Sequence, residues 1–169
     1  TRTSSAYFSS KSAVAPDAFA ASIFITSVTT GRSFLISSFT IASTCAATTK
    51  IAIMYYPTGE SKETLVMDRP PIHIFINTRI IADAPSEFLW AGIGDTIAKN
   101  YEVSFSCRNR NLDYLNSMGL QLAPLTSEPL IKYGVKAYED IKQHICSKEL
   151  EEVILGIIIS TGLVSVLVD

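Results

Sequence analysis

Sixteen consecutive residues, at positions 153–168, contain no charged side chain. A helix that is apolar over such a length is buried either in a protein core or in a membrane. A membrane span needs about 20 predominantly apolar residues, whereas this run is shorter and includes Gly156, Ser160 and Gly162. We therefore predict a buried core helix. Ser147 is suited to cap its start, because a serine side chain accepts hydrogen bonds from the first unpaired backbone N–H groups.

The composition of the 169-residue chain is that of a globular protein with one domain or two small ones, since 47% of it is apolar and 18% is charged. The net charge of −2 argues against a nucleic-acid-binding surface, which would be strongly basic. The three cysteines, Cys45, Cys107 and Cys146, lie too far apart for a Cys-x-x-Cys motif. We therefore expect reduced thiols and a cytoplasmic protein.

The first 49 residues contain four charged side chains and 20 serines or threonines, whereas the remaining 120 residues carry 26 charges. Residues 19–28 form one apolar run, which fits a strand or a short buried helix. The rest of residues 1–38 contains no chemical motif; it is Ser-rich and acid-poor, as transit peptides are, but lacks their regular arginines. Because the chain begins with Thr1 and not with Met, we expect a fragment or a processed product.

The next segment has the pattern of short strands. Residues 50–56 predict a strand, residues 57–60 have turn chemistry, and residues 63–67 complete a hairpin. Residues 72–76 predict a further strand, which we expect to be buried because it is mostly apolar. His73 within it is interpreted as a core or edge histidine, since no other ligand-type residue has suitable spacing.

Residues 40–49 are small and rich in hydroxyl groups. Such a run lets backbone N–H groups and hydroxyls approach a ligand closely, as in phosphate-binding loops. The alternative is a loop that caps a helix.

Helical spacing begins with a short turn at residues 79–82, followed by a helix over residues 87–102 with Ser86 as its N-cap. One face carries an aspartate, Asp95, among small and apolar residues. A buried carboxylate is costly unless it is paired or bound to a cation, so Asp95 is either a metal ligand or bonded to backbone or to Lys99. The predicted face consists of Phe88, Ala91, Gly92, Asp95, Ala98 and Glu102.

Residues 103–128 are polar and predict a loop. Pro129 suits the first position of a helix, and apolar residues then recur every three or four positions to about Cys146. His144 lies on the polar side of this helix and is expected to be exposed. The apolar positions are Leu130, Tyr133, Ala137, Ile141 and Ile145.

Two stretches together resemble a known family. Residues 40–48, followed by residues 53–55, resemble the nicotinamide-side loop of the glycerol dehydrogenases. Residues 91–99 resemble the start of their metal-binding helix, and residues 80–85 stand in the expected place between the two. The resemblance covers about residues 39–105. The wider group is the iron-containing alcohol dehydrogenase superfamily, which includes dehydroquinate synthase.

The resemblance implies a fold class and a site. Residues 1–84 would be part of an α/β, Rossmann-like NAD-binding domain, of which residues 1–38 do not match the family. Residues 85–169 would be part of an all-helical metal-binding domain, with the active site in the cleft between the domains. Asp95 would be a ligand of Zn²⁺ or Fe²⁺. The NAD site would be lined by Thr40, Ile41, Ala42, Ser43, Thr49, Ile51 and Tyr55.

The resemblance also implies a reaction, the NAD-dependent oxidation of a secondary alcohol to a ketone. The metal would act as a Lewis acid on the substrate hydroxyl, and the hydride would pass to NAD. The substrate would be a small alcohol, polyol or hydroxy acid. The full-length parent would be a cytoplasmic protein able to form a homo-oligomer, with neither a nucleic acid nor a membrane as partner.

Three departures from the family pattern qualify this expectation. The chain contains no two adjacent glycines, although the family has a Gly-Gly-Gly loop before the position of Thr40. His73 and His144 do not match the two histidine ligands of the family. Cys45 stands where glycerol dehydrogenases have an aspartate that contacts the polyol, which favours other hydroxy compounds as substrates. We expect an incomplete chain that is inactive alone; the alternatives are a non-catalytic nucleotide-binding remnant and a small membrane-attached or interaction protein.

Overall fold

A computed structural model describes residues 7–10, 21–24, 36–56, 58, 60–66 and 68–168. The chain divides into two compact units. The strand unit comprises residues 1–40 and 46–77, and the helical unit comprises residues 41–45 and 78–169. The short segment Ile41–Cys45 therefore belongs to the helical unit, although strand-unit residues precede and follow it in the sequence.

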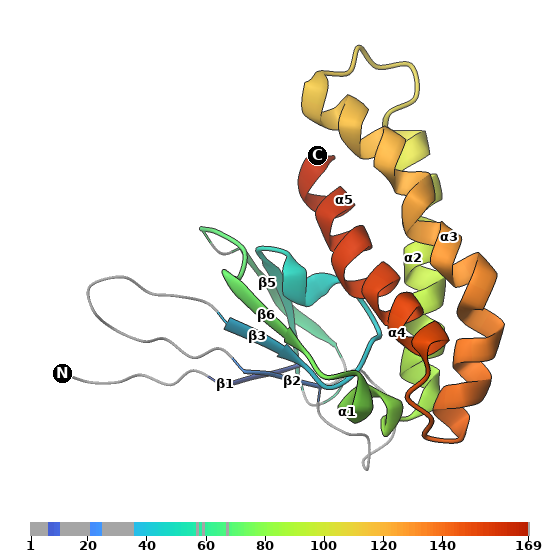
Figure 1. The fold of residues 1–169 in the computed structure, drawn as a ribbon. Helices are drawn as coiled ribbons and strands as arrows, with labels where there is room; N and C mark the ends of the chain where they lie inside the picture. Colours follow the sequence, from blue (N-terminus) through green and yellow to red (C-terminus); the bar gives the residue numbers. More distant parts are fainter. Residues whose placement is uncertain are drawn as a thin grey trace. The chain divides into compact units, whose positions relative to one another are not determined.

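In the part of the strand unit that the structure describes, the strands form three two-stranded sheets, and Figure 1 shows their course. The strands β1 (Tyr7–Ser10) and β2 (Ala21–Phe24) pair antiparallel, and β3 (Ile36–Phe39) pairs parallel with β6 (His73–Ile76). The strands β4 (Ile51–Tyr55) and β5 (Ser61–Val66) form an antiparallel hairpin after the short 3₁₀ helix η1 (Ala46–Thr48). The predicted hairpin is confirmed, although Pro57, Gly59 and Met67 lie outside the described residues. The apolar run at 19–28 is a strand at Ala21–Phe24, and its other residues also lie outside the described part.

The strand β6 forms where expected, but the prediction that it is buried is wrong. Phe75 is 58% exposed, and His73 and Ile74 are also exposed. Within the described residues β6 pairs with one strand, β3, and its apolar side chains remain open to solvent. Apolar composition therefore predicted the strand correctly but not its burial.

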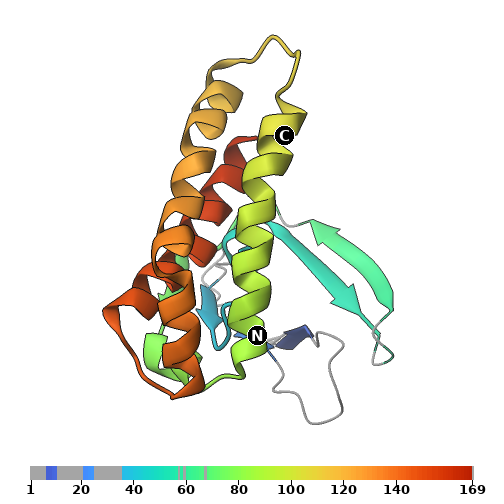
Figure 2. The ribbon, with the colours of Figure 1, turned by 90° about the vertical axis from the view of Figure 1, so that its right-hand side faces the viewer.

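The helical unit is built from α1 (Thr78–Ala82), α2 (Ser86–Ser106), α3 (Tyr114–Lys142), α4 (Lys148–Leu155) and α5 (Thr161–Leu167), with a π-helical turn, η2 (Gly156–Ser160), joining α4 to α5. Figure 2 shows α2 and α3 side by side, with the continuous α4–η2–α5 segment packed against them. Ser147 caps α4 as predicted, since its Oγ accepts a hydrogen bond from Leu150 N at 3.1 Å.

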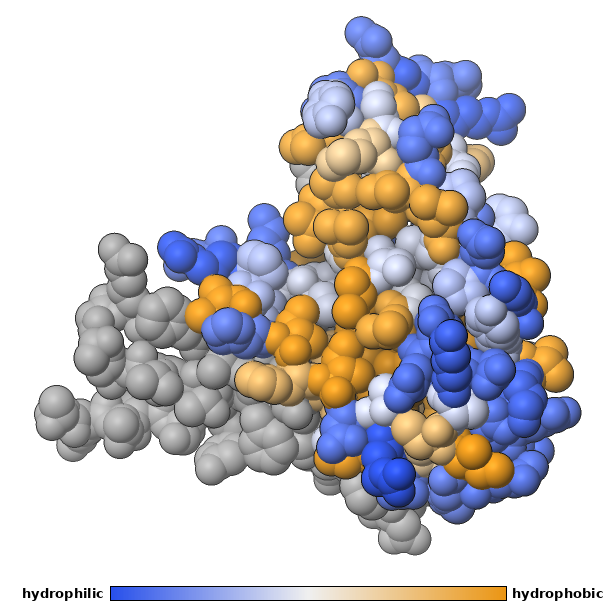
Figure 3. All heavy atoms as spheres, in the orientation of Figure 1, coloured by the Kyte–Doolittle hydropathy of each residue, from blue (hydrophilic) through white to orange (hydrophobic). Residues whose placement is uncertain are grey.

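The α4–η2–α5 segment supplies much of the core, which confirms the predicted core helix in part. Its buried side chains include Val153, Ile154, Ile157, Ile158 and Val164. Full burial of such a side chain contributes about 1.5–3 kcal/mol relative to exposure. Its other face is open, and Figure 3 shows hydrophobic side chains gathered over α5.

One helical segment among the described residues, Lys148–Leu167, is long and apolar enough to cross a membrane by length and composition. Half of its most apolar window is buried inside the helical unit, as is common for the core helix of a globular protein.

The prediction of a loop at residues 103–128 is confirmed for residues 107–113 and wrong for the rest. The helix α2 continues to Ser106, and α3 begins at Tyr114, where the Asp113 carboxylate accepts a hydrogen bond from Asn116 N at 2.8 Å. Pro129 lies inside α3 rather than at its first position, as does Pro124. An internal proline costs about 3 kcal/mol in helix propensity, so burial of residues such as Ala123 and Leu130 outweighs that cost. The helix ends at Lys142 rather than Cys146, and His144 beyond it is exposed as predicted.

The buried face of α2 also differs from the predicted one. Phe88 and Gly92 are buried as expected, but Ala91, Ala98 and Glu102 are exposed. The buried stripe runs instead through Phe88, Leu89, Gly92, Ile93, Thr96 and Val103. The cap position is Pro85 rather than Ser86, without a side-chain hydrogen bond. Asp95 consequently lies at the edge of the buried face and is half-buried.

Candidate functional site

The segment Ile41–Cys45 is the part of the hydroxyl-rich run that packs within the helical unit. Ala42 is 1% exposed and Cys45 is 6% exposed, and Ile41 is similarly buried. Ser43 is half-buried, and Thr44 is exposed. In this segment, therefore, Ile41 and Ala42 have only backbone groups to offer a ligand, whereas Ser43 and Thr44 also present hydroxyls.

Gly92 on α2 provides the seat for this segment. A Cβ at Gly92 would lie 2.1 Å from the Ala42 carbonyl oxygen and 3.0 Å from Ile157 Cδ1. Because real Cβ atoms do not approach a backbone oxygen so closely, only glycine admits the segment at this distance. A Cβ added at Gly94, two residues later, would meet nothing within 4 Å. The two glycines of the resemblance motif thus have different roles.

Cys45 makes the second attachment. Its Sγ lies 3.8 Å from the Ser165 Oγ on α5, and the Ser165 hydroxyl donates to the Thr161 carbonyl oxygen at 2.9 Å. Burial is the main cause that raises the pKa of the Cys45 thiol, and the Asp95 carboxylate raises it further. The Ser165 hydrogen bond and the Lys99 ammonium lower it by less. A buried neutral thiol of this kind is a poor nucleophile.

Asp95 stands near this thiol, together with Lys99 one turn further along α2. Lys99 Nζ lies 2.6 Å from Glu102 Oε2, and this hydrogen bond is the first cause that raises the pKa of Lys99. The charge of Asp95 raises it as well. The structure therefore brings the two resemblance motifs together: Asp95 and Lys99 act electrostatically on Cys45 within one unit.

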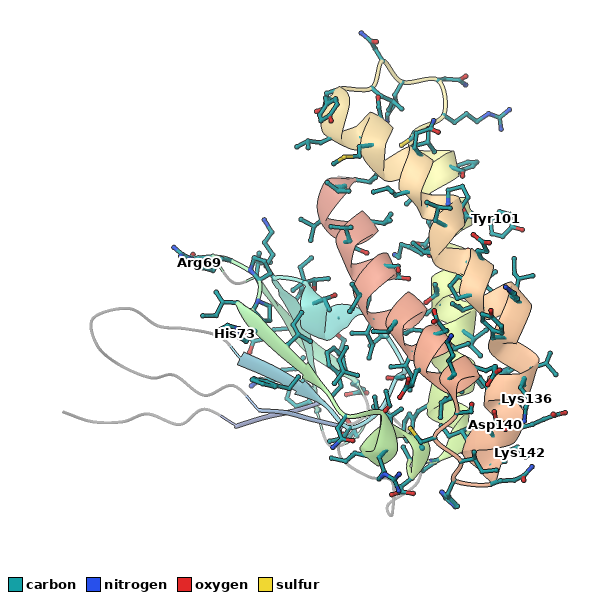
Figure 4. The ribbon with its side chains drawn as sticks, in the orientation of Figure 1. Arg69, His73, Tyr101, Lys136, Asp140 and Lys142 are labelled. Carbon is teal, nitrogen blue, oxygen red and sulfur yellow. The ribbon has the colours of Figure 1, made fainter. Side chains whose placement is uncertain are left out.

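The side chains around Asp95 do not fit a catalytic metal site. Among the described residues, no three His, Cys, Asp or Glu side chains form a group that could hold a metal ion. His73 lies on β6 in the strand unit, as Figure 4 shows, and His144 Nδ1 instead lies 3.2 Å from the Ala82 carbonyl oxygen. A catalytic zinc site needs three protein ligands. Metal binding by Asp95 stays a prediction.

The expected nucleotide residues of the strand unit have one feature that fits a ligand. Thr40 Oγ1 is buried and makes no hydrogen bond within the described part of the chain. A buried hydroxyl without a partner costs free energy, and a bound nucleotide would remove that cost. Thr49 instead donates to the Ala46 carbonyl oxygen at 2.8 Å and accepts from Ile51 N at 3.2 Å. The Tyr55 side chain lies outside the described atoms.

Gly92 and Ser165 are the residues that sequence reasoning missed. A glycine inside a helix costs about 1 kcal/mol relative to alanine, so Gly92 already signalled a close backbone approach. Ser165 gave no such signal, because serines are common on the weakly polar side of a core helix.

The comparisons with known proteins agree with this arrangement. No family model matches the chain. A glycerol dehydrogenase from Thermotoga maritima is 35% identical over 129 residues, which cover 73% of this chain and 35% of that protein. Hydroxycarboxylate dehydrogenase A from Escherichia coli K12 is 30% identical over 131 residues, covering 77% of this chain and 36% of that protein.

The crystal structure of glycerol dehydrogenase from Schizosaccharomyces pombe matches with a TM-score of 0.66 and 28% identity, over 76% of this chain and 34% of that one. The chain is a glycerol dehydrogenase homologue. This homology to a branch of the iron-containing alcohol dehydrogenase superfamily extends over about 70% of the chain, which spans about a third of the length of the curated relatives that it matches.

Proposed function

We propose that this glycerol dehydrogenase homologue is a portion of an NAD-dependent, metal-dependent alcohol or polyol dehydrogenase. One observation carries the proposal: Ile41–Cys45 and the Gly92–Asp95 stretch, which are far apart in sequence, pack together in one unit. These are the two stretches whose resemblance to the family is strongest. Residues 1–84 would be part of the NAD-binding domain, and residues 85–169 would be part of the metal-binding domain.

The proposed NAD contacts come from the predicted residues in three ways. Thr40 would contribute its unpaired hydroxyl, whereas the buried Ile41 and Ala42 would contribute backbone groups. Ser43 would contribute a hydroxyl. When bound, NAD supplies the hydride acceptor, and that chemistry belongs to the cofactor. The remaining proposed contacts are Thr49, Ile51 and Tyr55.

Cys45 guides the proposal for the substrate. Because its pKa is raised, the thiol carries no charge at neutral pH, whereas an aspartate at the same place would repel a carboxylate. A neutral group there is compatible with an alcohol, a polyol or a hydroxy acid. Similarity to a hydroxycarboxylate dehydrogenase supports the inclusion of hydroxy acids.

The isolated chain is proposed to be inactive. Asp95 would be one metal ligand, and among the described residues no group of three His, Cys, Asp or Glu side chains could hold a metal ion. The parent protein is proposed to be cytoplasmic and able to form a homo-oligomer. The proposed location is supported by similarity to the dehydrogenases and by the burial of half of the most apolar helix.

The experiment is a calorimetric titration of the purified chain with NAD, paired with a turnover assay on glycerol in the presence of Zn²⁺ or Fe²⁺. We expect binding without turnover. Thr40→Val and Tyr55→Ala should weaken binding, and Thr64→Val, an exposed position on β5, is the control. Absence of NAD binding would contradict the nucleotide proposal, and robust NAD-linked oxidation of glycerol would contradict the proposed inactivity.

A further inference from the structure

We propose that Ile41–Cys45 is a strap fastened to the helical unit at two points, and that Gly92 and Ser165 are the positioning residues that hold it. The first fastening is the Ala42 carbonyl seated on Gly92, and the second is the contact between Cys45 and Ser165. The conformation of the strap is then set by α2 and α5. The expected effect of NAD on the strap rests on the function proposed above.

The seat on Gly92 is a steric fastening. At 2.1 Å from the Ala42 oxygen, an added Cβ would overlap a backbone atom, which cannot rotate away as a side chain can. Ile157 Cδ1 closes the other side at 3.0 Å. An alanine at this position therefore requires the strap to move. The exposed Gly94 offers a matched control on the same helix, since its added Cβ would meet nothing within 4 Å.

The contact at Cys45 has a defined direction. The Ser165 hydroxyl has one proton, which it donates to the Thr161 carbonyl oxygen. With that proton engaged, we assign the Cys45 thiol as the donor and the Ser165 oxygen as the acceptor, across 3.8 Å. The raised pKa of the thiol keeps that donor proton in place at neutral pH. Cys45 cannot be chemically modified while it contacts Ser165, because a modified sulfur can neither donate a hydrogen bond nor fit in the buried position.

The alkylation rate of Cys45 in the intact 169-residue chain therefore reports how often the strap opens. The chain is alkylated with iodoacetamide under native conditions, and peptide mass spectrometry follows each cysteine separately. Cys107, which is buried in the cluster with Val103, Ala123 and Val164, reports global unfolding. Cys146 is half-buried and reports a more accessible thiol. We expect Cys45 to react more slowly than Cys146.

The Ser165→Ala variant tests the second fastening. Loss of one hydrogen-bond acceptor should speed alkylation of Cys45 by about threefold to fivefold, with Cys107 unchanged. Ser165→Thr, which keeps the hydroxyl, should restore the wild-type rate. The control is Ser104→Ala, because Ser104 also donates to the carbonyl four residues earlier, at 2.9 Å, but is exposed on α2.

The Gly92→Ala variant tests the first fastening and should have the larger effect, a rise of about tenfold or more in the Cys45 rate, whereas Gly94→Ala should leave the rate unchanged. Cys45 rates equal to wild type in Ser165→Ala and Gly92→Ala would overturn the strap. So would equal increases at Cys45 and Cys107 in Ser165→Ala, since the opening would then be global. If Gly92→Ala unfolds, the Ser165 variants decide.

Alkylation in the presence of NAD tests the strap and the proposed function separately. Binding along Thr40–Ser43 should slow alkylation of Cys45 in the wild-type chain, because it stabilises the seated strap. If NAD has no effect while the Ser165 and Gly92 variants behave as expected, the nucleotide proposal fails and the strap stands.

Discussion

The two units of this chain bury their side chains to different extents. The helical unit has a continuous set of fully buried residues from α3 and α4–η2–α5, among them Leu150, Ile154 and Ile158. In the strand unit, Phe39 is the buried hydrophobic residue among those whose side chains the structure describes, and Phe75 on β6 is mostly exposed. The hairpin of β4 and β5 can thus form from local pairing and turn chemistry, whereas the helical unit depends on its core. Mutations should therefore affect the two units very differently.

The largest effect is expected from Ile154→Ala. Ile154 is 0% exposed in the core of the helical unit, and removal of such a side chain costs about 2–5 kcal/mol of unfolding free energy. Urea denaturation followed by helical circular dichroism measures this cost. Ile159→Ala, on the exposed face of the same segment, is the control and should cost much less. Equal losses of unfolding free energy in the two variants would contradict the distinction between core and surface positions in this unit.

A smaller loss is expected from Asp140→Asn. Asp140 is 1% exposed, and it pairs with Lys136 on α3, as Figure 4 shows, and accepts a hydrogen bond from Ser147 Oγ at 2.6 Å. Loss of a buried charged partner costs about 1–3 kcal/mol. The measurement is the same urea denaturation at pH 7, with Asp83→Asn, at an exposed carboxylate, as the control.

Asp140 should also make the stability of the fold depend on pH. The hydrogen bonds from Lys136 and then from Ser147 lower the pKa of Asp140 in the folded state. The unfolded chain therefore binds the proton more readily, so this stabilisation is present above the ordinary aspartate pKa of about 4. It is lost as the pH falls below that value toward the folded pKa. Asp140→Asn should flatten the acid limb of a stability-against-pH curve, and an unchanged limb would contradict the assignment.

A gain is expected from Gly94→Ala. Gly94 is exposed inside α2, with open space around its missing side chain. Alanine should therefore add about 1 kcal/mol of helix propensity without strain. Thermal denaturation should show a higher Tm. A lower Tm would mean that the residue has a contact role like that of Gly92, and the distinction between the two glycines would fail.

The smallest effect is expected from Phe75→Ser on β6. Because the side chain is mostly exposed, its replacement should change the unfolding free energy of the helical unit by less than about 0.5 kcal/mol. Helical circular dichroism during urea denaturation measures this. A large loss would show that the helical unit depends on β6 for its stability.

Short sequence patterns predicted an element correctly where they contained turn residues or a capping serine. The hairpin of β4 and β5 and the cap at Ser147 follow from short patterns, and both are present. The first half of α3 could not be predicted, because Pro124 and Pro129 oppose a helix and only tertiary burial outweighs them.

The candidate site shows the same limit. Asp95 could be singled out because a carboxylate on a small-residue face is unusual. The true buried face of α2 shares Phe88 and Gly92 with the predicted one but otherwise runs through other residues, and the Ala42 backbone packs against it at Gly92. That contact joins residues 50 positions apart in the sequence, so no local pattern contains it.

The π-helical turn at Gly156–Ser160 inserts one residue into an otherwise regular helix, and the seven residues of α5 follow it. Deleting one residue from the turn would rotate everything after it by roughly 100° about the axis. Val164 would then leave the interior, and the hydroxyl of Ser165 would point elsewhere. The length of this stretch is therefore as constrained as the identity of its buried residues, Ile157 and Ile158.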